Sequence, residues 1–207
     1  GYVGAVSAAC LAELGHDVIG VDINKKKVDA INAGRSPLVE ERLAELIFHH
    51  VGTGKLKATT DHAAAIAASD IAMLCVATPS ARAGHVNTTA LEAVTAQIGE
   101  ALRATARVKG KKASAKSYTV VVRSTAMPDV HVRLAKLLAK SSGRDDIAYV
   151  CHPEFLREGS SVRDFFEPPI LRIEAIRLVY RQIDFALAGV VAVAGQNLEP
   201  LRQERAI

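Results

Sequence analysis

The chain has 207 residues, of which 49% are hydrophobic and 23% charged, and its mean hydropathy is +0.15. This is a globular composition, long enough for one large domain or two small ones. The net charge of +4 comes from basic residues without interleaved aromatics, which argues against nucleic-acid binding. We find no transmembrane span and no signal peptide, so we expect a cytoplasmic protein with no membrane contact.

The three cysteines, Cys10, Cys75 and Cys151, lie in apolar runs. An odd number in such runs is typical of reduced core thiols in a cytoplasmic protein. Their spacing does not fit a metal site, and we predict none.

The first stretch organises the chain. Gly1 and Gly4 are followed by a small apolar run at 5–12, a turn at Gly15, and a β-branched strand at 17–22 that ends in Asp22. In a dinucleotide-binding fold, glycines let the backbone approach the pyrophosphate at a helix N-terminus, and an acid about 20 residues on accepts the ribose hydroxyls. The full fingerprint also has an earlier glycine and a preceding strand. Taken alone, this partial fingerprint leaves a nucleotide site and an ordinary small-residue helix equally open.

Helices and strands alternate along the rest of the chain. The pattern predicts helices at 24–33, 40–50, 61–69, 88–104 and 130–140, and strands at 71–76, 118–122 and 147–150. This alternation predicts an α/β protein with a Rossmann-like, doubly wound, mostly parallel sheet, truncated at the first strand.

Polar turns follow the later strands. Thr78 follows the strand at 71–76, and its pattern alone favours a simple strand end. Thr125 follows 118–122, and the turn at 152–158 carries Glu154 and Glu158. Two acids around an arginine can bind a polyhydroxylated ligand, position a water for general-base catalysis, or form a helix-capping cluster of ion pairs, and the spacing does not separate these. Because parallel strands end at one edge of a sheet, we expect all three turns beside the opening glycines.

At this point the chain resembles the nucleotide-sugar 6-dehydrogenases, the family of UDP-glucose and GDP-mannose dehydrogenases. The matching segments are Gly-Tyr-Val-Gly at 1–4, Val-Ile-Gly-Val-Asp at 18–22, Ser-Pro-Leu-Val-Glu at 36–40, Ala-Thr-Pro-Ser at 77–80, Val-Val-Arg-Ser-Thr at 121–125, Pro-Glu-Phe-Leu-Arg-Glu-Gly at 153–159, Asp164-Phe165 and Pro168-Pro169. The segments at 36–40 and 121–125 look closest to GDP-mannose 6-dehydrogenase.

The resemblance implies NAD-dependent oxidation of the C6 alcohol of a nucleotide sugar to the uronic acid. GDP-mannose is the favoured substrate and UDP-glucose the alternative, in a homo-oligomeric full-length enzyme. It also implies roles for individual residues. The cofactor would be bound by Gly1, Tyr2, Val3, Gly4, Asp22, Lys27, Thr78 and Thr125. Glu154 and Thr125 would be catalytic, and the sugar nucleotide would contact Glu158, Phe155, Leu156 and Arg157. His152 stands where the family often has Asn.

The chain also departs from the family. We expect an NAD-binding domain at 1–174 and a divergent segment at 175–207, which faintly resembles a connecting helix. The family's nucleophilic Cys lies in a C-terminal domain, and none of the three cysteines here stands in its motif. We therefore expect a partial copy that is inactive alone and of marginal stability.

Two other classes remain open. The chain is a dehydrogenase part if a separate chain supplies the Cys domain, and a non-catalytic dinucleotide-binding module if none does. A hydroxyacid dehydrogenase is a third reading, against which the segment at 153–158 argues.

Overall fold

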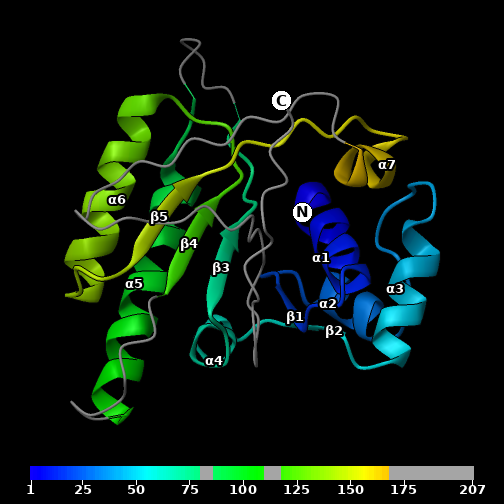
Figure 1. Ribbon diagram of the computed structural model, residues 1–207, viewed down its shortest axis with the longest axis horizontal. Coiled ribbons are helices and arrows are strands. Elements are labelled where there is room, and N and C mark those ends of the chain that lie inside the picture. The colour runs from blue at the N-terminus through cyan, green and yellow to red at the C-terminus, as the bar shows by residue number, and fades with distance from the viewer. Residues whose placement is uncertain (80–85, 110–117, 168–207) are drawn as a thin grey trace, which may run out of the picture.

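The computed structural model describes residues 1–79, 86–109 and 118–167 (Figure 1). The elements, in chain order, are α1 (Tyr2–Glu13), β1 (Val18–Val21), α2 (Lys25–Asn32), α3 (Leu43–Gly52), β2 (Leu56–Thr59), α4 (His62–Ala67), β3 (Ile71–Leu74), α5 (Thr89–Lys109), β4 (Thr119–Val122), α6 (Pro128–Ser142), β5 (Ala148–Cys151) and α7 (Ser161–Phe166). The expected features at Ser80, at Pro168-Pro169 and at 175–207 lie outside the described residues. No helix in the described part is long and apolar enough to cross a membrane.

The described strands form two parallel sheets. One has the order β1-β2, with Val18 opposite Leu56, and the other has the order β3-β4-β5, with Leu74 opposite Val122. Each neighbouring pair is parallel, which confirms the expected sheet type.

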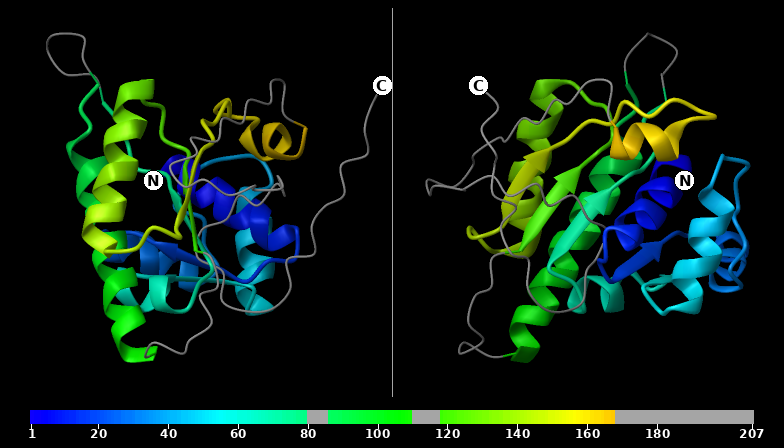
Figure 2. Two further views of the ribbon diagram at one scale, coloured as in Figure 1. Left: turned by 60° about the vertical axis from the view of Figure 1, so that its left-hand side comes forward. Right: turned by 45° about the vertical axis from the view of Figure 1, so that its right-hand side comes forward.

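Helices cover both faces of the larger sheet. Successive strand residues point to opposite faces, so each face carries apolar side chains that pack against helices. Met73 and Val121 belong to a core cluster with α1 and α3, whereas Leu74 and Val122 belong to a second cluster with α5 and α6. The left view of Figure 2 shows these two helix layers on either side of the strands. The predicted doubly wound α/β fold is therefore confirmed.

A cavity of about 410 Å³ separates the two sheets. It is lined on one side by β1 and β2, including Gly20 and Leu56, and on the other by β3, including Ala72 and Leu74. Within the described residues, neither β1 nor β3 pairs with a strand at its inner edge. The slot between these edges corresponds to the position of the first strand that the partial fingerprint led us to expect.

Four elements differ from the sequence prediction. Helix α5 runs to Lys109, five residues past its expected end at 104. The helix expected from residue 40 begins only at Leu43, because Arg42 adopts a left-handed backbone (φ 62°) and Glu40 is engaged elsewhere. Strand β2 was not expected, because it has only four residues and two of them are polar. Helix α7 was also not expected, because its six residues are too few to show a helical period.

Candidate functional site

The opening glycine turn begins α1 at the carboxyl edge of the sheet (Figure 1). Gly4 lies against the segment after β3, and a Cβ added at Gly4 would be 3.4 Å from the Cβ of Cys75. Among the described residues, no side chain caps α1 and no acid lies in its first turn. The first N–H groups of α1, which include those of Tyr2 and Val3, are therefore available to an anion.

Asp22 follows β1 and faces this turn. Its Oδ2 lies 3.0 Å from the Gly1 nitrogen, and its Oδ1 accepts a hydrogen bond of 2.8 Å from the Asn24 backbone. Burial opposes ionisation, but these contacts and the nearby Lys27 hold the pKa of Asp22 below its ordinary value. The carboxylate is therefore ionised and held beside the glycines, as the spacing predicts.

The central cavity reaches this turn, and Gly1, Gly4, Asp22 and Lys27 line its upper end. Most of the remaining lining is apolar and comes from strands β1, β2 and β3 and from helices α1 to α5. We therefore assign only the upper end to a cofactor and the remainder to the slot between β1 and β3.

Thr78 and Thr125 meet at the carboxyl ends of β3 and β4. The Thr78 hydroxyl donates a hydrogen bond of 3.0 Å to the Thr125 carbonyl. Ser124 donates another of 2.7 Å to the Val76 carbonyl and so ties the two strand ends together. The structure thus brings these two polar turns together beside the segment that Gly4 contacts.

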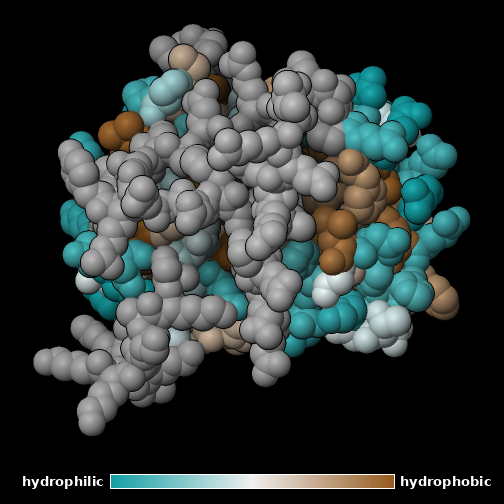
Figure 3. Space-filling view, in the orientation of Figure 1, coloured by the Kyte–Doolittle hydropathy of each residue, from teal (hydrophilic) through white to brown (hydrophobic). Residues whose placement is uncertain are grey.

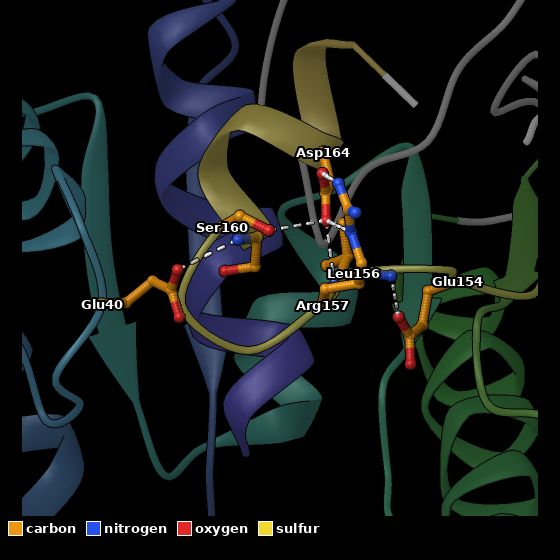
Figure 4. Close-up of polar contacts among 7 residues, drawn as sticks. Glu40, Glu154, Leu156, Arg157, Ser160 and Asp164 are labelled. Atoms are coloured by element: carbon orange, nitrogen blue, oxygen red, sulfur yellow. Dashed lines mark hydrogen bonds and ion pairs between the residues drawn. The ribbon is translucent and has the colours of Figure 1, made fainter. Parts of the chain in front are cut away.

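The turn after β5 carries five of the predicted residues, of which Figure 4 labels Glu154, Leu156 and Arg157. Glu154 Oε2 accepts a hydrogen bond of 2.7 Å from the Leu156 backbone, and the Leu156 side chain packs against the core cluster beneath. Phe155 is 42% exposed, and Glu158 is exposed. Glu154, Phe155 and Glu158 are accessible to a ligand, whereas Leu156 also anchors the turn.

Arg157 is engaged by Asp164, which is 3% exposed. The Arg157 guanidinium donates hydrogen bonds of 2.9 Å and 2.6 Å to the two carboxylate oxygens of Asp164, and the Arg157 backbone N–H donates a third of 3.1 Å (Figure 4). The Arg157 hydrogen bonds hold the pKa of Asp164 well below its usual range, although burial opposes this shift. This ion pair links the turn at 153–160 to helix α7.

Arg123 and His152 lie beneath this turn. Arg123 is only 6% exposed, one of its terminal nitrogens lies 3.4 Å from His152 Nδ1, and its guanidinium lies 5.8 Å from the Phe165 ring centre. Burial, with the Arg123 charge, lowers the pKa of His152 to about 4, so this histidine is neutral at pH 7.

The sequence reading assigned no role to Glu40, Arg123 or Asp164. All three stand in segments that match the family, at 36–40, 121–125 and 164–165, but only the fold shows what they contact.

Cys10 and Cys151 are buried, and Cys75 is half-buried. Burial raises the pKa of Cys75 to about 11 and that of Cys10 to about 12. Neither is an activated nucleophile. Among the described residues, no group of three or more His, Cys, Asp or Glu side chains could hold a metal ion.

A doubly wound parallel sheet with a glycine turn facing an acid after the next strand defines a Rossmann-type dinucleotide-binding domain. Residues 1–173 match the model of the UDP-glucose/GDP-mannose dehydrogenase family, NAD binding domain. The chain belongs to this family, and NAD is the cofactor of the matched domain.

Individual relatives agree with this assignment. The chain is 40% identical over 196 residues to GDP-mannose 6-dehydrogenase of Pseudomonas savastanoi pv. phaseolicola, covering 89% of this chain and 43% of the relative. It is 34% identical over 170 residues to UDP-glucose 6-dehydrogenase of Rhizobium meliloti, covering 81% of this chain and 36% of the relative. A crystal structure of a ternary complex of GDP-mannose dehydrogenase from Pseudomonas aeruginosa superposes with a TM-score of 0.77 at 39% identity, covering 85% of this chain and 39% of that one. The chain thus spans about two fifths of these relatives.

Proposed function

We propose that this chain is the cofactor-binding part of an NAD-dependent nucleotide-sugar 6-dehydrogenase, with GDP-mannose as the favoured substrate and GDP-mannuronate as the product. The observation that carries the proposal is the meeting of the α1 glycine turn with Asp22 at the edge where Glu154 and Glu158 also lie. The names and identities of the relatives support the substrate class, and the higher identity to the GDP-mannose enzymes favours that sugar.

The cofactor site fits a dinucleotide. The N–H groups of Tyr2 and Val3 would bind the pyrophosphate, for which Gly4 leaves α1 close to the strand end. Asp22 would accept the adenosine ribose hydroxyls, and Lys27, beside it, would contact the same ribose. Thr78 and Thr125 would lie further along the cofactor. When bound, NAD accepts a hydride from the substrate.

The substrate would lie over the turn at 153–159. Glu158 would contact the sugar nucleotide together with Phe155 and Arg157, while Leu156 positions the turn. Glu154, oriented by the Leu156 N–H, would act as general base or orient a water, with Thr125 helping to hold that water. Oxidation to the acid also needs a thiolate, which buried Cys10 and Cys75 do not provide.

The second candidate function is a catalytically inactive dinucleotide-binding module. A UDP-glucose 6-dehydrogenase part is the alternative within the first class. For the enzyme we further propose a cytoplasmic homo-oligomer that acts in polysaccharide biosynthesis, without nucleic-acid or membrane partners. The domain division at residue 174 stays a prediction.

Isothermal calorimetry with NAD tests the proposal. We expect the wild type to bind and Asp22→Ala to bind about tenfold more weakly or worse, because the ribose loses a charged acceptor. Asp29→Ala is the matched control, since Asp29 lies exposed on α2 in an ion pair with Lys25 and should leave affinity unchanged. Equal affinity in Asp22→Ala, or no binding by the wild type, would contradict the site. With NAD present, tighter binding of UDP-glucose than of GDP-mannose would overturn the choice of sugar.

A further inference from the structure

The carboxylate of Glu40 links the opening glycine turn, called the cofactor turn below, to the turn at 153–160, which carries Glu158. Glu40 Oε2 accepts hydrogen bonds of 2.5 Å from the Tyr2 hydroxyl and 2.9 Å from the Gly159 N–H. Its Oε1 accepts a third, of 3.0 Å, from the Ser161 N–H (Figure 4). Glu40 stands about 120 residues away from Gly159 and Ser161 in the sequence, so only the fold brings the three segments together.

These contacts act where the backbone is otherwise free to turn. Gly159 has a left-handed backbone (φ 88°) and directly follows exposed Glu158, so whatever holds the Gly159 N–H sets the direction of Glu158. On the other side of the turn, the Asp164 carboxylate accepts hydrogen bonds from the Arg157 guanidinium and the Ser160 hydroxyl. Glu40 and Asp164 therefore hold the turn from opposite sides, but Glu40 alone also contacts the cofactor turn.

The charge of Glu40 suits three donors. Although its burial works the other way, hydrogen bonds from Tyr2, Gly159 and Ser161 hold the pKa of Glu40 below its ordinary value. A glutamine at this position has one acceptor oxygen and one NH₂ donor. In Glu40→Gln, the NH₂ group would face one of the two backbone N–H groups, of Gly159 or Ser161. One of the hydrogen bonds that tie Glu40 to this turn is then lost, although the side chain keeps its size.

We propose that Glu40 is a positioning residue that sets the Glu158 turn against the cofactor turn through Tyr2, so that NAD binding at Tyr2 orders the substrate-binding turn. The coupling rests on the proposed function, because it assigns NAD to the Tyr2 turn and the sugar nucleotide to Glu158. The tie itself rests only on the contacts of Glu40.

Amide hydrogen exchange at Gly159 and Ser161, measured on the full chain, tests both parts. Without NAD, we expect Glu40→Gln to speed exchange about tenfold or more at one of these two amides, the one that faces the glutamine NH₂, because its charge-assisted hydrogen bond is lost. Glu41→Gln changes the exposed neighbouring glutamate and should leave exchange as in the wild type. Equal exchange in the two variants would overturn the tie. Helix α6 provides an internal reference, and its exchange should not change.

The coupling is tested by adding saturating NAD. In the wild type, NAD should slow exchange at Gly159 and Ser161 several-fold. In Tyr2→Phe, which keeps the ring and removes the hydroxyl, and in Glu40→Gln, this slowing should be lost at NAD concentrations that saturate each variant. A merely structural role for Glu40 would leave the NAD-dependent slowing intact, and slowing that persists in Tyr2→Phe overturns the coupling. Absence of NAD binding by the wild type refutes the proposed function and the coupling together, whereas the comparison without NAD still decides the tie.

Discussion

The two parallel sheets border the same cavity, yet their strands are buried to different extents. In the β3–β5 half (residues 71–151), β4 has a partner at each edge, and Val120, Val121 and Val122 are at most 2% exposed. In the β1–β2 half (residues 1–59), β1 pairs with β2 alone among the described strands, and its last residue, Val21, is 41% exposed. Both strands are predominantly apolar in sequence, and β3, which also has a single partner, is buried throughout, so neither composition nor the number of partners accounts for the exposure of Val21.

The same contrast appears on the surface. Ile23, Val39 and Phe48, all in the β1–β2 half, are 99%, 103% and 72% exposed. On the face seen in Figure 3, hydrophilic side chains dominate the right-hand rim, with hydrophobic ones exposed just inside it. An unpaired inner edge beside exposed apolar residues favours association between chains. We therefore expect the β1–β2 half to limit the stability of the molecule.

Filling the slot should have the largest effect. We expect an apolar β-strand of about five residues, joined before Gly1 through a glycine-containing turn, to lie parallel between β1 and β3. Burial of its side chains contributes ~1.5–3 kcal/mol each and ordering costs ~1.5 kcal/mol per residue, so five residues gain at most about 7.5 kcal/mol, with about 4 kcal/mol at the middle of this range. The midpoint of thermal unfolding should rise by roughly 10 °C or more.

The control for this experiment is the same extension with proline at its central position, because proline lacks the backbone N–H of a ladder hydrogen bond and is not accommodated in a central strand. This variant should melt like the original chain and aggregate at the same concentration. Equal midpoints for the two extensions would show that the slot does not accept a strand, and the contrast between the halves would then need another cause.

Much of the fold could be predicted from sequence because its local signals agree with its final state. The continuous apolar runs at 71–76 and 118–122 lie in a sheet covered on both faces, which is the only environment that buries such runs completely. Strand β2 could not be predicted, because Leu56 and Ala58 gain their burial from β1 and from helices α1, α2 and α3, which lie elsewhere in the sequence. The glycine turn and Asp22 lie in one contiguous segment, so their spacing in the sequence is enough to predict that they lie together in the fold.

The connections of the site could not be predicted in the same way. Glu40, Arg123 and Asp164 act through partners set by tertiary packing, and Glu40 gives no local sign of a link to residues 159–161. The reading of Glu154 to Glu158 left ligand binding and a capping cluster open. In the structure, residues of this segment have different environments: Arg157 is paired with Asp164, whereas Glu158 is exposed. The ligand roles stay predictions.

A glycine substitution compares packing in the two halves directly. Gly99 lies where α5 crosses α6, and an added Cβ would be 1.9 Å from the Ser141 Oγ and 2.8 Å from its Cβ. Gly99→Ala must push the two helices apart, and we expect a loss of about 2–3 kcal/mol in the free energy of unfolding. Urea titration followed by circular dichroism measures this loss.

Gly52, in α3 of the β1–β2 half, is the matched control, because an added Cβ there meets nothing within 4 Å among the described residues. Gly52→Ala should be neutral or stabilise the chain by up to about 1 kcal/mol, since alanine is the better helix former. A loss in Gly52→Ala equal to that in Gly99→Ala would mean that both halves are packed alike.

The smallest effect is a pH dependence located in the β3–β5 half. His152 has a folded pKa of about 4, whereas in the unfolded chain it titrates near ~6.5, so between these values the unfolded state binds the extra proton. The stability due to neutral His152 is thus complete above ~6.5 and is lost as pH falls towards 4. After a discount for partial exposure, we expect a loss of about 1–2 kcal/mol between pH 7 and pH 5.

His152→Asn should abolish most of this loss, because asparagine does not titrate and can still accept a hydrogen bond from Arg123. Burial also lowers the pKa of His16, in the β1–β2 half, while Asp17 beside it works in the opposite direction. His16→Asn should therefore keep most of the slope. A shallower pH dependence in His16→Asn than in His152→Asn would place the acid-sensitive group in the β1–β2 half, and acid would then act on that half first.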